Sequence, residues 1–72
     1  MKKYRIRKLI NGLYVAEIYS GFIFKSWKGI AWYGTYPIGA GNYDRFCVGT
    51  LSSCYAKLAR YGVGEDDVEF ID

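Results

Sequence analysis

Two cysteines, Cys47 and Cys54, are the side chains of this sequence best suited to nucleophilic chemistry. A cysteine or serine nucleophile normally needs a neighbouring general base, and histidine is the usual base near neutral pH. The chain contains no histidine. Asp44 or Glu17 would have to act as the base, but the other acidic residues gather near the C-terminus without a recognisable paired spacing. The sequence therefore predicts a protein that is not an enzyme.

The same two cysteines bear on metal binding and redox chemistry. A structural zinc site needs four soft ligands, and two cysteines without histidine do not supply them. Cys47 and Cys54 are seven positions apart, which is not the Cys-x-x-Cys spacing of redox motifs. We expect no metal and two buried, reduced thiols, with a Cys47–Cys54 disulfide as the alternative.

A glycine-rich segment, residues 39–44, invites comparison with phosphate-binding loops. A dinucleotide-binding fingerprint requires a third glycine where Asp44 stands, and a P-loop requires Gly-Lys followed by Ser or Thr. Neither requirement is met. We interpret the segment as a connecting loop and expect no cofactor.

Positive charge concentrates in the first part of the chain. Residues 1–28 have a net charge of +6 and residues 29–72 a net charge of −3. The densest cluster comprises Lys2, Lys3, Arg5, Arg7 and Lys8. Alternate residues of a strand share one face, so this cluster could follow nucleic-acid phosphates, with Tyr19 or Trp27 as a stacking surface. We favour the solvated face of an edge strand, because an isoelectric point near 8.9 is modest for a nucleic-acid-binding protein.

A tryptophan between two lysines is a second candidate for a partner contact. Trp27 lies in residues 25–29, which we expect to form a turn. An exposed tryptophan there would be an interface anchor, and the alternative is a ring folded back over the sheet. We place Trp32 in the core. The predicted partner-binding residues are Lys25, Trp27, Lys28, Arg5, Arg7 and Tyr19.

Residues 3–19 have the pattern of a β-hairpin that turns at Asn11-Gly12. A two-residue loop would pair charged with apolar residues on both faces of the hairpin. A three-residue loop, residues 10–12 with Gly12 in the left-handed region, avoids this conflict. It predicts one buried face, with Tyr4, Ile6, Ala16 and Ile18, and one basic, solvated face, with Lys3, Arg5, Glu17 and Tyr19.

The remaining pattern predicts a strand, a helix and a short acidic tail. The strand lies within residues 22–36 and is either continuous or broken at residues 26–29. The pattern predicts it most clearly from residue 30, and Pro37 ends it. Thr50 begins a helix that Gly62 ends. The apolar stripe of this helix is Leu51, Cys54, Tyr55, Leu58 and Ala59, while Ser52, Ser53, Lys57 and Arg60 face solvent. Residues 65–72 form an edge strand or an ordered tail beside the basic hairpin.

These elements predict one α+β domain over residues 1–72, with a three-stranded or four-stranded antiparallel sheet covered on one face by a single C-terminal helix, in the order β-β-β-α. A hydrophobic content of 51% excludes disorder. The sequence shows no signal-peptide pattern and no apolar stretch of about 20 residues. We expect a cytoplasmic protein without a membrane partner, and uncovered sheet edges would allow a homodimer.

A basic three-stranded sheet followed by one helix resembles two groups of small proteins. This order, with Tyr4-Arg5-Ile6-Arg7-Lys8 in the first strand, is similar to accessory proteins encoded by bacteriophages and to the DNA-binding domains of integrases. The first resemblance implies a small protein that binds, and modulates or inhibits, a host protein. We expect a non-enzymatic protein-binding module; the alternative is a nucleic-acid-binding module that uses the basic face of the N-terminal hairpin.

Overall fold

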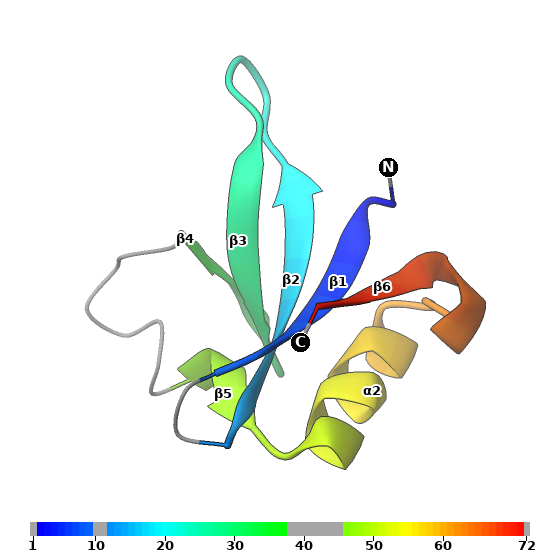
Figure 1. Ribbon diagram of the computed structural model, residues 1–72. Helices are drawn as coiled ribbons and strands as arrows, with labels where there is room; N and C mark the ends of the chain where they lie inside the picture. The colour runs from blue at the N-terminus through cyan, green and yellow to red at the C-terminus, as the bar shows by residue number, and fades with distance from the viewer. Residues whose placement is uncertain (1, 10–11, 38–45, 72) are drawn as a thin grey trace.

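The fold is α+β, with a mostly antiparallel sheet and a C-terminal helix packed against it, as the sequence predicts (Figure 1). The computed structural model describes residues 2–9, 12–37 and 46–71. Its elements are β1 (Tyr4–Lys8), β2 (Tyr14–Ser20), β3 (Ser26–Ala31), β4 (Gly34–Pro37), β5 (Val48–Gly49), α2 (Leu51–Arg60), a 3₁₀ turn (Glu65–Asp67) and β6 (Val68–Ile71). The strand order is β4-β3-β2-β1-β6, and β5 pairs with β2 beside this path.

The β1–β2 hairpin has the register that a three-residue loop predicts. Tyr4 lies opposite Ile18, and Ile6 lies opposite Ala16. Gly12 has a φ of +83°, in the left-handed region that glycine enters without a steric penalty. Residues 10–11, which complete the expected loop, lie outside the described residues. The hairpin therefore places its four apolar residues on one face, toward the helix.

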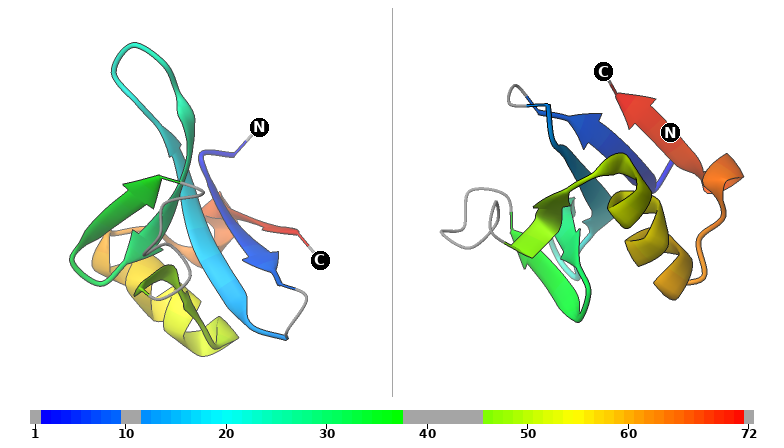
Figure 2. Two further views of the ribbon diagram at one scale, coloured as in Figure 1. Left: turned by 90° about the vertical axis from the view of Figure 1, so that its left-hand side faces the viewer. Right: turned by 90° about the horizontal axis from the view of Figure 1, so that it is seen from below.

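Helix α2 begins and ends where the sequence predicts. The Oγ1 atom of Thr50 accepts a hydrogen bond from the backbone N–H of Ser53 at 3.2 Å, which caps the first turn. Gly62, with a φ of +78°, ends the last turn. The helix packs over one side of the sheet (Figure 2), where Cys54 and Leu58 join a core formed with Ile6, Ala16, Ile30 and Val68.

The outer side of α2 differs from the prediction at two positions. Lys57 was expected to face solvent, but only 3% of it is exposed. Its Nζ donates a hydrogen bond to the backbone carbonyl of Cys47 at 3.4 Å and lies 5.8 Å from the ring centre of Trp32. Ala59, assigned to the apolar stripe, is exposed. The chain around Cys47, which precedes the helix, covers the side of the helix that carries Lys57. The helical pattern of apolar residues shows only which side faces the sheet, so it contains no information about this other contact.

The third strand is broken, but not at the expected position. Strand β3 covers Ser26–Ala31 and β4 covers Gly34–Pro37, so the turn lies between them. Trp27 and Lys28 are consequently strand residues and not turn residues. Trp32, expected in the core, is exposed at the turn. The glycine-rich segment, residues 39–44, and its Asp44 lie outside the described residues.

The acidic C-terminal segment forms an edge strand, as one of the two alternatives predicts. Strand β6 runs parallel to β1, with Val68 opposite Tyr4 and Glu69 opposite Arg5. Strand β1 is therefore flanked on both sides, by β2 and β6. The interpretation of β1 as an edge strand is therefore wrong, whereas the expected position of the acidic segment beside the basic hairpin is confirmed.

The second face of the sheet carries its own small core. Val15, Ala31 and Cys47 are buried there, with Leu9, Tyr36 and Val48 packed around them. Strand β5 pairs with Tyr14 and Val15 and brings this part of the chain over β2. The face expected to be basic and solvated is therefore only partly solvated, because Glu17 is buried and Arg5 and Arg7 are partly buried, whereas Lys3 is exposed. Cys47 and Cys54 are buried on the two different faces and are not joined in a disulfide.

Candidate functional site

A buried glutamate holds the two arginines of β1. Glu17 lies opposite Arg5 in the hairpin register and has no exposed surface. Arg5 Nε donates to Glu17 Oε1 at 2.7 Å, and Arg7 donates from Nε and Nη2 to the two carboxylate oxygens at 3.2 and 3.3 Å. The arginine side chains keep only 18% and 34% of their surface exposed. A buried carboxylate requires such partners, because unpaired it would lose its solvation without compensation.

Trp27 lies on the same face and completes a stack of side chains. The guanidinium carbon of Arg5 is 3.8 Å from the centre of the Trp27 ring, a cation–π contact. Tyr19 lies opposite Trp27 in the strand register, and the two ring centres are 5.3 Å apart. Of the two alternatives for Trp27, the ring folded back over the sheet is the one observed. This Arg5–Trp27–Tyr19 stack joins β1, β2 and β3 near the loop end of the β2–β3 hairpin.

The structure brings together four of the six predicted partner-binding residues, namely Arg5, Arg7, Tyr19 and Trp27. Lys28 is not among them, because neighbouring residues of a strand point to opposite faces, and it lies opposite Ile18 on the helix side. Lys25 precedes β3 and is exposed at the base of the loop between β2 and β3. The six residues therefore do not form one continuous surface.

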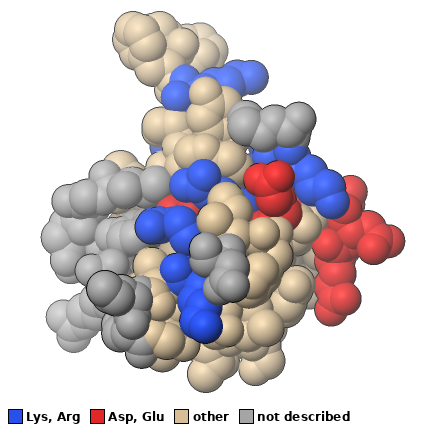
Figure 3. All heavy atoms as spheres, viewed as in Figure 1, with Lys and Arg blue, Asp and Glu red and all other residues tan. Residues whose placement is uncertain are grey.

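An apolar tip that the sequence analysis placed in a strand is the longest run of exposed large apolar residues in the described chain. Phe22, Ile23 and Phe24 occupy the loop between β2 and β3, and their exposed fractions are 100%, 76% and 87%. The loop projects beyond the rest of the molecule (Figure 1), and in the space-filling view it forms a protrusion with basic atoms below it (Figure 3). We call Phe22–Phe24 the apolar tip.

A glycine closes the apolar tip. A Cβ atom on Gly21 would collide with the backbone carbonyl oxygen of Phe24, so the loop is tight enough to require glycine there. This residue is also the signal that could have identified the loop. Gly21 and Lys25 enclose three consecutive apolar residues, whereas a strand with one solvated face alternates apolar and polar side chains.

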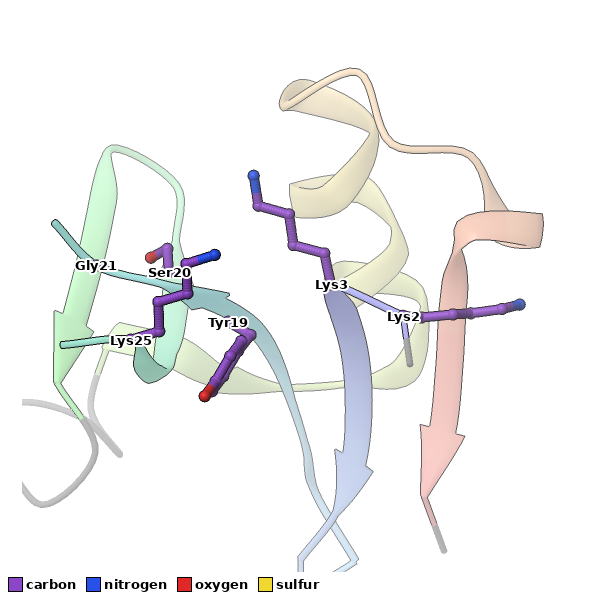
Figure 4. A pocket seen from close by; sticks show the side chains of 6 residues that line it. All are labelled: Lys2, Lys3, Tyr19, Ser20, Gly21 and Lys25. Atoms are coloured by element: carbon purple, nitrogen blue, oxygen red, sulfur yellow. The ribbon is translucent and has the colours of Figure 1, made fainter. Parts of the chain in front are cut away.

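A hollow of about 300 Å³ lies at the base of the same loop. Lys2, Lys3, Tyr19, Ser20, Gly21 and Lys25 line it (Figure 4). Sequence analysis identified Lys25 and Tyr19 as candidates and placed Lys3 on the same hairpin face as Tyr19, but it did not bring Lys2 or Lys25 to them. Tyr19 N donates to the backbone carbonyl of Lys3 at 2.8 Å, and this hydrogen bond brings the start of the chain to the end of β2.

The buried thiol of Cys54 has a shifted pKa. Burial raises the pKa of Cys54 above its ordinary value of 9.0, while the charge of Lys57 and a hydrogen bond from the backbone at Ala16 lower it in part. A raised pKa keeps the thiol protonated and therefore poorly nucleophilic near neutral pH. Cys54 lies in the core under α2, so the geometry favours a packing role for this side chain.

Acidic residues of the C-terminal segment lie beside basic residues of the N-terminal segment, with Glu69 opposite Arg5. Acidic residues of the 3₁₀ turn and of β6 lie on the side away from the hairpin loop (Figure 3).

In the described part of the chain, no helix has the length and apolar character needed to cross a bilayer. Comparisons of the chain with protein-family models, with curated proteins and with solved structures found no match.

Proposed function

We propose that this chain is a small, non-enzymatic protein-binding module whose apolar tip inserts into an apolar pocket of a partner protein. The observation that carries the proposal is the near-complete exposure of three consecutive large apolar side chains, Phe22, Ile23 and Phe24. Each such side chain gains about 1.5–3 kcal/mol when it is fully buried, so a pocket that accepts them would bind with substantial affinity. Contiguous exposed apolar surface of this kind marks interaction sites in soluble proteins.

The stem of the hairpin supports this use of the tip. Strands β2 and β3 pair from Glu17 opposite Gly29 to Ser20 opposite Ser26. The Arg5–Trp27–Tyr19 stack fixes the loop end of the stem to β1, one residue pair before the strands end. A tip held in place before binding loses less conformational entropy on association than a mobile one. In this proposal Arg5, Tyr19 and Trp27 position the apolar tip, and the tip itself contacts the partner.

The nucleic-acid alternative has weaker support. It requires Arg5 and Arg7 to face phosphates, yet both arginines bind the buried Glu17. Freeing them would leave that carboxylate without its charged partners. The resemblance to bacteriophage accessory proteins implies that the partner is a host protein that the chain modulates or inhibits, and this remains a prediction.

Site-specific photo-crosslinking tests the proposal in cells that produce the chain. A photoreactive phenylalanine analogue replaces Ile23 in one variant and Tyr33, which is exposed in the turn after β3, in a matched control variant. We expect the Ile23 variant to form a covalent adduct with a distinct protein that the control does not form. That protein, once purified, should bind the Phe22→Ser/Ile23→Ser/Phe24→Ser variant at least 100-fold more weakly, because buried aromatic anchors dominate binding energy.

Three outcomes would overturn the proposal. Identical adducts from both positions would mean that the tip has no specific protein partner. Adducts with lipid instead of protein would assign the tip to a membrane surface. Binding of single-stranded or duplex nucleic acid at low salt, lost when Arg5 and Arg7 are both changed to alanine, would favour the alternative function.

A further inference from the structure

We propose that the hollow at the base of the β2–β3 loop is a binding site for an oxyanion, a carboxylate or a phosphate group, held by Lys3 and Lys25. The site combines two separate parts of the chain. Lys3 precedes β1, and Lys25 precedes β3, so only the folded sheet places them on the same hollow. The inference concerns a different surface from the apolar tip and needs no partner protein to be tested.

The directions of the side chains favour Lys3 and Lys25 over Lys2. Figure 4 shows the side chains of Lys3 and Lys25 extending to the same side of the two chain segments, whereas the hydroxyl of Ser20 points away from Lys3. Lys2 points away, toward β6, and its Nζ donates to the backbone carbonyl of Asp66 at 2.6 Å. The ammonium of Lys2 is thus already engaged outside the hollow.

The chemistry of the lining explains the preference for an anion. An ammonium group offers three hydrogen-bond donors and no acceptor, so the two lysines together can satisfy several acceptor oxygens of one anion. None of the side chains that line the hollow is acidic. Two positive charges that share one hollow repel each other, and a bound anion replaces this repulsion with attraction. A volume of about 300 Å³ accommodates a phosphate group or a carboxylate side chain.

The position of the hollow suggests where the anion comes from. Gly21 and Lys25 line the hollow and directly flank the apolar tip. If the pocket of a partner protein receives Phe22–Phe24, acidic residues at the rim of that pocket would contact Lys3 and Lys25. This source of the anion rests on the proposed function. A free phosphate compound is the other source of the same chemistry.

Titrations with two probes at low ionic strength test the site. Pyrophosphate represents a free phosphate compound, and a peptide of six glutamates represents an acidic protein surface. Binding is followed by NMR through the backbone amide signals of Ser20 and Gly21. We expect saturable shifts with at least one probe, and an affinity that is about threefold to fivefold lower in Lys3→Gln and in Lys25→Gln, the range of exposed ion pairs.

Lys8→Gln is the matched control, because Lys8 is an exposed lysine at the other end of β1 that does not line the hollow. We expect it to change the affinity less than twofold. Binding of pyrophosphate alone would assign the site to a free phosphate compound, and binding of the peptide alone to a partner's carboxylates. Equal losses in all three variants would show general attraction to the positive charge of the protein and overturn the proposal, as would the absence of shifts with both probes. The triple serine variant of the tip should keep its anion affinity, so the two proposals fail separately.

Discussion

The guanidinium group of Arg5 is placed between two partners: its carbon lies 3.8 Å from the centre of the Trp27 ring, and its Nε donates to Glu17 at 2.7 Å. A side chain that would otherwise be free to contact a partner is thereby part of the folded structure. The same contacts connect β1 to the stem of the β2–β3 hairpin. The arrangement couples the stability of the sheet to the presentation of the apolar tip.

Replacing Arg5 should destabilise the protein more than replacing Arg7. Arg5→Ala removes the shorter bond to a fully buried carboxylate together with the contact to Trp27, and we expect a loss of about 2–4 kcal/mol in the free energy of unfolding. Arg7→Ala should cost about 1–2 kcal/mol, because its bonds to Glu17 are longer and its side chain is more exposed. Urea denaturation measures both values. Equal losses would mean that the contact with Trp27 contributes little.

The apolar tip should contribute almost nothing to stability. The Phe22→Ser/Ile23→Ser/Phe24→Ser variant replaces side chains that are largely exposed, so the free energy of unfolding should change by less than about 0.5 kcal/mol. Circular dichroism during urea denaturation measures it. A large loss of stability would show that the tip packs against the rest of the protein, contrary to its observed exposure.

Gly21 should be far less tolerant of substitution than Gly34. Gly21→Ala places a methyl group against the carbonyl oxygen of Phe24, so the loop must rearrange. Gly34→Ala meets no atom within 4 Å and has an ordinary φ. We expect a loss of more than about 1 kcal/mol for the first variant and a change of less than about 0.5 kcal/mol for the second.

NMR spectra of the same two glycine variants locate the effect. In Gly21→Ala the signals of residues 20–25 should move, while those of α2 should stay in place. Equal stability of the two variants would show that the tip adopts a more open conformation than the one described.

Stability should decrease at alkaline pH because of Cys54. Burial raises the pKa of this thiol in the folded state above 9.0, its ordinary value. Above that pH the unfolded chain loses a proton that the folded chain still keeps, so rising pH favours unfolding. The contribution of the Cys54 thiol to stability is complete below its pKa in the unfolded chain and is lost as pH rises through its pKa in the folded protein. The free energy of unfolding falls by at most about 1.4 kcal/mol per pH unit from this group.

Cys54→Ala isolates this effect. Urea denaturation of both proteins at about pH 7.5 and about pH 10 should show a smaller loss in the variant than in the natural chain. The two proteins differ only at position 54, so the difference between their losses reports on the thiol. Parallel losses would mean that Cys54 ionises in the folded state as readily as in the unfolded chain.

Local features of the sequence determined the β1–β2 hairpin and the helix. Gly12 and the alternation of Tyr4, Ile6, Ala16 and Ile18 define the register, because a shift of one residue would move every apolar side chain to the other face. Thr50 and Gly62 define the ends of α2 through hydrogen bonding and backbone conformation within a few residues. These signals act over short distances along the chain, so the sequence alone reveals them.

Only the tertiary structure decided which polar side chains are buried and which apolar ones are exposed. Lys57 is buried because the chain around Cys47 meets it in space, and Glu17 is buried although the hairpin register places it on the face expected to be solvated. Phe22–Phe24 stay exposed because the strands end before them. Burial depends on contacts between residues far apart in the sequence, and a local pattern specifies what a side chain prefers but not which neighbour reaches it.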